Sequence, residues 1–116
     1  MGYESRLYVI RKGSGALEDE DGKAWAEVIA TFNLCTVNID FFKYPATDSY
    51  IYDGGERVVE DKYGDPLREL TIKEAIDEIE LASIDEPYRR WNPVLGLLKG
   101  FNEHEWRDLR VLHYGY

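Results

Sequence analysis

Hydrophobic and polar positions alternate in two segments near the start of the chain. Residues 5–11 (SRLYVIR) alternate loosely and are rich in strand-forming residues, which predicts a first strand. In residues 24–34 one register is apolar and the other is mixed, which predicts a second strand with one buried face. The apolar register consists of Ala26, Val28, Ala30, Phe32 and Leu34.

Two adjacent glycines interrupt the next pair of strand-forming segments. Residues 50–52 and 57–59 are rich in Tyr, Ile and Val, and Gly54 and Gly55 lie between them. Paired glycines supply the positive φ angles of tight hairpin turns, so this pattern predicts a β-hairpin. The apolar residues in the segment 110–114 predict a closing strand.

Apolar residues recur every three or four positions after this hairpin. Their spacing predicts an amphipathic helix over residues 72–83, and Thr71 with Glu74 matches a capping box at its start. A second, mostly apolar and therefore buried helix is predicted from Asn92 and Pro93, with Gly100 as its end. A third helical turn is predicted for residues 102–106.

The order of these elements is strands, then helices, then one strand. This order predicts an α+β fold, with a mainly antiparallel sheet and two or three short helices packed on one face. The length of 116 residues predicts a single domain covering residues 1–116. The chain has one cysteine, Cys35, which excludes an intramolecular disulfide and a zinc site built from cysteines alone. No apolar stretch of about 20 residues is present, so a cytoplasmic protein without a membrane span is expected.

The acidic residues are concentrated in the middle of the chain. The net charge is −9, from 23 acidic and 14 basic side chains, which disfavours direct binding to nucleic acid. Residues 40–86 alone hold 14 acidic and five basic side chains, a net charge of −9. The rest of the chain is therefore neutral overall.

These acids indicate a candidate binding surface. A negative surface on rigid elements can occupy a basic, nucleic-acid-binding channel on another protein, and exposed tyrosines beside it can anchor the contact. The alternative is a solvated helix face that keeps the protein soluble. The candidate partner-binding residues are Tyr50, Tyr52, Glu56, Glu60, Asp61, Glu74, Asp77 and Glu78.

A second candidate site is the most basic short segment of the chain, Tyr88, Arg89, Arg90 and Trp91. Arginine binds phosphate through two parallel hydrogen bonds, and the aromatic rings offer faces for stacking, so this segment predicts a small-molecule site of the nucleotide type. The alternative is that the two arginines pair with the neighbouring acids in residues 85–86.

The sequence names no catalytic residue. His104 and His113 match no metal-binding spacing, and the glycines at 13 and 15 lack the rest of a phosphate-binding loop. We therefore expect a non-enzymatic protein without a metal or other cofactor. A third possibility is a catalytic or virion-assembly component, and no feature of the sequence distinguishes it from the other two.

Three segments carry a resemblance to known proteins. Residues 1–10 (MGYESRLYVI), 97–101 (LLKGF) and 111–116 (VLHYGY) resemble small, acidic, uncharacterised proteins of Gram-positive phages and prophages. The resemblance implies a phage-encoded protein, acting in the host cytoplasm, that inhibits a host protein such as a nucleic-acid-guided defence nuclease. It implies no active site.

Overall fold

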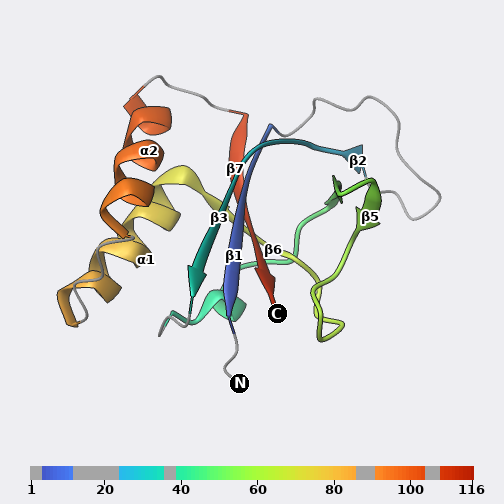
Figure 1. Cartoon of the computed structure of the whole chain (residues 1–116), viewed down its shortest axis with the longest axis horizontal. Helices are drawn as coiled ribbons and strands as arrows, with labels where there is room; N and C mark the ends of the chain where they lie inside the picture. Colours follow the sequence, from blue (N-terminus) through green and yellow to red (C-terminus); the bar gives the residue numbers. More distant parts are fainter. Residues whose placement is uncertain (1–3, 12–23, 36–38, 86–90, 104–107) are drawn as a thin grey trace.

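The computed structural model describes residues 4–11, 24–35, 39–85, 91–103 and 108–116 (Figure 1). The strands are β1 (Ser5–Arg11), β2 (Ala24–Trp25), β3 (Glu27–Cys35), β4 (Ser49–Asp53), β5 (Glu56–Val58), β6 (Arg68–Thr71) and β7 (Leu109–Gly115). The helices are the short 3₁₀ helix η1 (Phe41–Lys43), α1 (Ile72–Asp85) and α2 (Trp91–Glu103). The predicted α+β class with a mainly antiparallel sheet is confirmed.

Four strands form the main sheet, in the order β3-β1-β7-β6, and every neighbouring pair is antiparallel. The predicted first and last strands form its centre: β1 pairs with β7 without interruption, from Ser5 opposite Gly115 to Arg11 opposite Leu109. Two backbone hydrogen bonds between Glu4 and Tyr116 continue this pairing to the end of the chain. β6, which is only four residues long and leads directly into α1, was not predicted.

A smaller sheet, in the order β2-β4-β5, lies at the end of the molecule opposite the helices (Figure 1). β4 and β5 form the predicted hairpin, and its turn residues Gly54 and Gly55 have φ angles of +60° and +84°. β2 pairs with β4 in parallel, through Ala24 and Trp25. The hairpin thus gains a third strand from a distant part of the chain.

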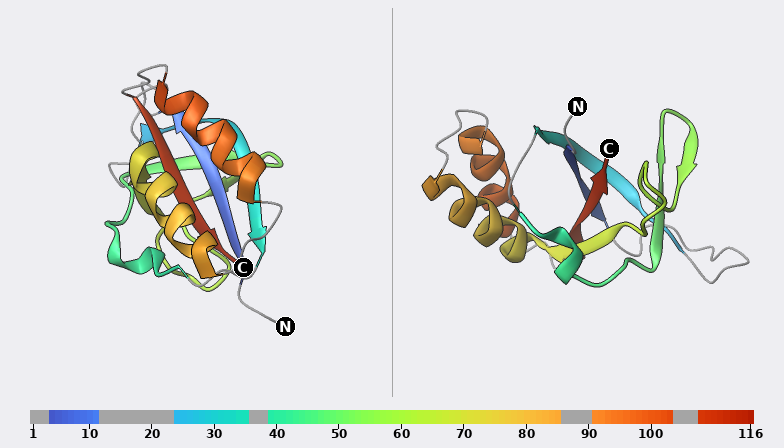
Figure 2. Two further views of the ribbon diagram at one scale, coloured as in Figure 1. Left: turned by 90° about the vertical axis from the view of Figure 1, so that its left-hand side faces the viewer. Right: turned by 90° about the horizontal axis from the view of Figure 1, so that it is seen from below.

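The two helices and the smaller sheet cover opposite faces of the main sheet (Figure 2). Because side chains alternate along a strand, Leu7 and Val9 of β1 pack against α1 and α2. Tyr8 and Ile10 of the same strand pack on the other face, against Ile51 of β4. The main sheet therefore lies between two hydrophobic cores.

α2 differs from its prediction in length and in exposure. It begins at Trp91 and continues through Gly100 to Glu103, so the predicted end at Gly100 is wrong. A glycine costs about 1 kcal/mol in a helix relative to alanine, and the ring of Phe101, which packs on the core beyond it, offsets that cost. Leu97 is 43% exposed, so α2 is buried along one side only.

The predicted strand over residues 24–34 is interrupted at Ala26. The Ala26 amide donates a hydrogen bond to the Tyr50 carbonyl (2.9 Å), which ties the chain to the smaller sheet and separates β2 from β3. Beyond this point β3 leaves the smaller sheet and crosses the main sheet beside β1 (Figure 1). A single segment therefore contributes to both sheets.

A register shift within β3 moves its apolar side chains from one core to the other. Ala30 is opposite Val9 of β1, whereas Val28 is opposite Ile10, so Ile29 is an extra residue in the pairing. Val28 packs on the core under the smaller sheet, and Ala30 packs on the core under the helices. The predicted alternation of buried and exposed positions is present, but its apolar register serves both faces of the sheet.

Candidate functional site

The structure divides the eight predicted binding residues between two ends of the molecule. α1, which carries three of these eight residues, lies beside α2, while β4 and β5 lie at the opposite end of the molecule, across the main sheet (Figure 1). The loop that follows β5 carries the remaining two acids. These residues therefore do not form one continuous surface.

Two of the acids on α1 stabilise the helix itself. The Glu74 carboxylate accepts a hydrogen bond from the Thr71 amide (2.9 Å), and the Glu74 amide donates to the Thr71 hydroxyl (3.1 Å). This is the predicted capping box. Asp77 forms an exposed ion pair with Lys73 one turn earlier (3.0 Å).

Glu78 connects α1 to the segment around η1. Its side chain is only 13% exposed, and it pairs with Lys43 and accepts a hydrogen bond from the Tyr44 hydroxyl (2.8 Å). Burial and the nearby Glu78 carboxylate raise the pKa of Tyr44 well above its usual value. A carboxylate in this position has internal partners and little surface to offer another protein.

The acids near the hairpin differ from one another in exposure. Asp61 is buried and accepts hydrogen bonds from the amides of Tyr63 (2.8 Å) and Asp65 (3.0 Å), so it shapes the turn after β5. Glu56 and Glu60 are exposed. Only these two of the three predicted acids at this end are accessible to a partner.

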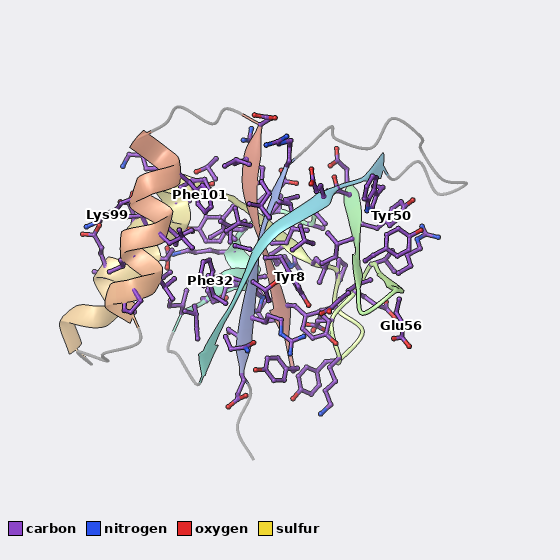
Figure 3. The ribbon with its side chains drawn as sticks, turned by 45° about the horizontal axis from the view of Figure 1, so that its top comes forward. Tyr8, Phe32, Tyr50, Glu56, Lys99 and Phe101 are labelled. Atoms are coloured by element: carbon purple, nitrogen blue, oxygen red, sulfur yellow. The ribbon has the colours of Figure 1, made fainter. Side chains whose placement is uncertain are left out.

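Aromatic side chains gather on the outer face of the smaller sheet. The ring centroids of Tyr50 and Tyr52 are 5.6 Å apart, and those of Tyr52 and Trp25 are 6.4 Å apart. The Arg57 guanidinium lies 4.4 Å from the Tyr50 ring centroid, a cation–π contact. We call Trp25, Tyr50, Tyr52, Glu56 and Arg57 the hairpin surface; Figure 3 labels Tyr50 and Glu56 in it.

Sequence reasoning missed Arg57 and, among the aromatic members of this surface, Trp25. It lies in the outward register of the predicted strand 24–34, the one signal that could have indicated its exposure. Its proximity to Tyr52 depends on the parallel pairing of β2 with β4, a contact between segments 25 residues apart. Trp25 and Tyr52 are 38% and 48% exposed.

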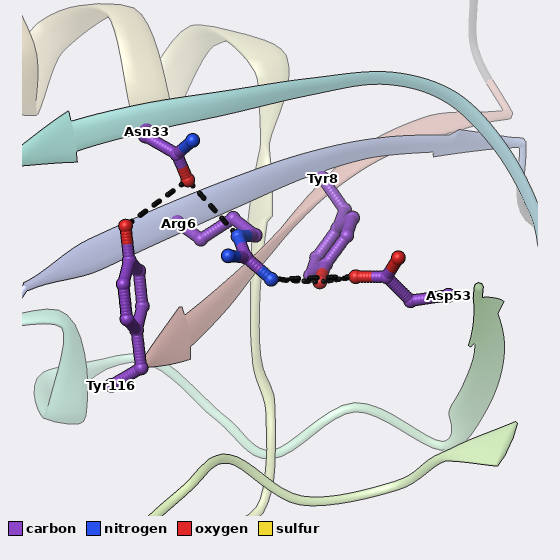
Figure 4. A network of polar contacts seen from close by, with 5 residues as sticks. All are labelled: Arg6, Tyr8, Asn33, Asp53 and Tyr116. Atoms are coloured by element: carbon purple, nitrogen blue, oxygen red, sulfur yellow. Dashed lines mark hydrogen bonds and ion pairs between the residues drawn. The ribbon is translucent and has the colours of Figure 1, made fainter. Parts of the chain in front are cut away.

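Asp53 fixes the hairpin to the main sheet (Figure 4). The Tyr8 hydroxyl donates a hydrogen bond to the Asp53 carboxylate (2.6 Å), and the Arg6 guanidinium pairs with the same oxygen (3.3 Å). Burial raises the pKa of Tyr8 to about 12, so its hydroxyl remains a donor at neutral pH. The hairpin is thereby held against β1 at its turn as well as through its core.

The tyrosines at the end of the chain pack around Arg6. Its guanidinium lies 4.7 Å from the Tyr116 ring centroid and 5.6 Å from that of Tyr114. Asn33 accepts hydrogen bonds from the Arg6 guanidinium (3.0 Å) and the Tyr116 hydroxyl (3.3 Å), as Figure 4 shows. The last residues thus belong to the polar network that supports the hairpin.

His113 lies buried in β7. Its ring stacks on Phe41 at a centroid distance of 4.1 Å, and its Nε2 atom is 2.9 Å from the Ser5 hydroxyl. Burial, together with the charge of Arg68, lowers the pKa of His113 to about 4. The described residues contain no group of three or more His, Cys, Asp or Glu side chains that could hold a metal ion.

The second predicted site lies mostly outside the described residues. Tyr88, Arg89 and Arg90 fall within 86–90, which the structure does not describe, as does His104 within 104–107. Trp91 begins α2. The nucleotide-type site and the pairing of the two arginines stay predictions.

The comparisons with known proteins identify no relative. No protein family, curated protein or solved structure matches this chain. Within the described residues, no helix combines the length and hydrophobicity needed to cross a membrane.

Proposed function

We propose that this chain is a non-enzymatic binding protein whose hairpin surface engages a basic region of a partner protein. The observation that carries the proposal is the cluster of the Trp25, Tyr50 and Tyr52 rings on a three-stranded sheet, in which Trp25 and Tyr52 are exposed and Tyr50 is partly buried. Large aromatic side chains on a rigid support lose little conformational freedom when they are buried, which is why they are enriched among the residues that dominate interface energies.

The rigidity of this surface supports the proposal. Ile51 anchors β4 in the core beneath the hairpin, and Asp53 binds Tyr8 and Arg6 of the main sheet. Positive φ angles at the two turn glycines allow a tight turn between β4 and β5. A partner therefore meets rings whose positions are set before binding, which reduces the entropy cost of association.

Charge favours a basic partner over an acidic one. The net charge of −9 attracts a positive surface at long range, and Glu56 lies directly opposite Asp53 at the hairpin turn. The Arg57 guanidinium above the Tyr50 ring shows the geometry that a ring of this surface adopts with a cation. We expect arginine or lysine side chains of the partner to use the exposed faces of Tyr52 and Trp25 in the same way.

The acids of α1 are not part of the proposed contact. Glu74, Asp77 and Glu78 have partners within the molecule, so they contribute to the overall negative potential without forming the contact. The narrower expectations, namely a phage origin and a host nuclease whose nucleic-acid-binding surface is blocked, stay predictions.

Binding of an oligoarginine peptide tests the proposal without an identified partner. We expect calorimetry to detect binding that weakens as salt rises, because surface charges are then screened. Replacing both Trp25 and Tyr52 with alanine should weaken binding at least about tenfold, the loss expected when central aromatic contacts are removed.

A matched pair of charge reversals locates the contact. Glu56→Lys and Glu80→Lys change the net charge equally, but Glu80 lies on α1, where it pairs with Lys99 (3.3 Å). We expect only Glu56→Lys to weaken binding beyond the effect of total charge. Equal weakening by both variants would contradict a site at the hairpin, and absence of binding to the wild-type protein would reject the proposal.

A further inference from the structure

Among the residues that the structure describes, the main sheet has one covered edge and one open edge. At the β6 edge, the Thr47 amide donates a hydrogen bond to the Leu67 carbonyl (2.8 Å) and the Glu69 amide donates to the Pro45 carbonyl (2.9 Å). At the other edge, no strand in the described ranges pairs with the outer side of β3. An open edge presents backbone amides and carbonyls that can pair with another strand.

β3 lacks the prolines and lysines that often protect an open edge, although it has two register shifts. Glu27, its first residue, is its only charged side chain. Ile29 and Thr31 are exposed along it. Its register shifts at Ile29 and near Leu34 leave residues 30–33 as a regular segment that can form a ladder with another strand.

An apolar strip on α2 runs beside this edge. Figure 2 shows α2 on the β3 side of the sheet and α1 on the β7 side. Lys99 pairs with Glu80 of α1 and so marks the side of α2 that faces α1. Leu97 lies about 160° around the helix from Lys99, which directs it away from α1 and toward β3. Phe32 and Phe101, both partly buried, lie between α2 and β3 (Figure 3).

We infer that a second copy of this chain pairs along β3. The β3 edge and the Leu97 side of α2 form a surface that is complementary to itself, because a second copy offers the same strand edge and the same apolar helix side. A twofold axis near Thr31 would join the two four-stranded sheets through antiparallel β3 strands and bring the two α2 helices together.

Charge does not oppose this arrangement at the contact. In antiparallel pairing centred near Thr31, the two Glu27 side chains lie at opposite ends of the ladder. α1 packs against β6 and β7, on the side of the sheet away from β3 (Figure 2), and the β4–β5 turn lies at the end of the molecule opposite the helices (Figure 1). If the proposed function also holds, the dimer presents two hairpin surfaces and can bind a repeated partner with increased avidity.

Sedimentation over about 1–300 µM, which brackets weak and moderate dimers, tests this inference on the wild-type chain. We expect the mass to approach twice the 13.5 kDa of one chain as concentration rises. The mass of one chain at every concentration would overturn the inference. It would do so even if a strand of another protein pairs with β3, because that partner is absent from the experiment.

Lysine substitutions test the location of the contact. Thr31→Lys places two lysines opposite one another at the twofold axis, and Ile29→Lys adds one diagonal to each of them, so we expect the double variant to weaken dimerisation at least about tenfold. Leu97→Lys should do the same through α2 and serves as the second variant if the first does not fold. Leu81→Lys, at a residue of α1 that is 65% exposed, is the matched control and should dimerise like the wild type. Wild-type dimerisation by both the β3 variant and Leu97→Lys would overturn the inference.

Discussion

At the scale of single residues, the surroundings of each carboxylate decide whether a partner can reach it. Asp53 and Asp61 are both in turn regions of an acidic segment, yet Asp53 joins two sheets while Asp61 accepts backbone amides within its own turn. Glu78 is nearly enclosed by Lys43 and Tyr44. Counting acids along the chain therefore overestimates the negative surface available for binding.

We expect His113 to make the free energy of unfolding depend on pH. Its folded pKa of about 4 lies below the unfolded value of 6.5, so protonation favours the unfolded state. This contribution to stability is fully present above pH 6.5 and is lost as pH falls from 6.5 toward 4. The pKa difference corresponds to a maximum loss of about 3 kcal/mol in the free energy of unfolding.

Urea unfolding between pH 7 and pH 5 measures this effect. The variant His113→Gln keeps a polar side chain beside Ser5 but cannot titrate, so its free energy of unfolding should fall less over this range than that of the wild type. Equal pH dependence in the two proteins would show that other groups cause it.

At the scale of elements, the same residue type has opposite effects in a turn and in a helix. Gly55 occupies the left-handed region of the hairpin turn, with φ of +84°, a conformation that L-residues adopt only with strain. Gly96 lies on the exposed side of α2, where an added Cβ would have no atom within 4 Å. Backbone conformation distinguishes the two positions.

We therefore expect alanine substitutions at these glycines to change stability in opposite directions. Gly55→Ala should lower the free energy of unfolding by about 1–2 kcal/mol because of strain at positive φ. Gly96→Ala should raise it by about 0.5–1 kcal/mol, because alanine loses less conformational entropy in a helix. Chemical denaturation of both variants measures the two changes, and a loss of stability in both would contradict the assignment of α2.

At the scale of the whole molecule, the main sheet is shared by two cores. Leu7 and Val9 face the helices, and Tyr8 and Ile10 face the smaller sheet (Figure 2). β1 therefore packs against the helices on one face and against the hairpin on the other, and it couples the two ends of the molecule. We expect the two ends of the molecule to unfold together.

Ile51→Ala tests this coupling. Ile51 is fully buried under the hairpin, so its truncation should cost about 2–5 kcal/mol of stability. The exposed neighbour Tyr52→Ala, as control, should cost less than about 1 kcal/mol. Tryptophan fluorescence and far-ultraviolet circular dichroism should give coincident unfolding curves for both variants. A separate early transition in Ile51→Ala would show that the hairpin unfolds independently.

The elements that could be predicted are those whose signals are local. The capping residues Thr71 and Glu74 lie three positions apart and contact each other as expected. The hairpin glycines adopt the predicted positive φ angles. β6 carried no such signal, because a four-residue strand is defined by its pairing with β7.

The candidate site was predictable in part. The tyrosines of β4 alternate with buried residues, so their outward position follows from strand periodicity. Trp25 joins them only because β2 pairs with β4, and the α1 acids are separated from Glu56 only because the main sheet lies between them. Neither relation has a counterpart in the spacing of residues along the chain.

The sequence by itself determined the alternation of buried and exposed positions in β3 and β4, where α1 begins and where the hairpin turns, since these depend on backbone geometry over a few residues. Only the tertiary structure decided which core each buried side chain joins. Val28 and Ala30 share one apolar register, yet one extra residue in the pairing of β3 with β1 sends them to opposite faces of the sheet. That choice depends on strand pairing between distant segments, which local periodicity does not encode.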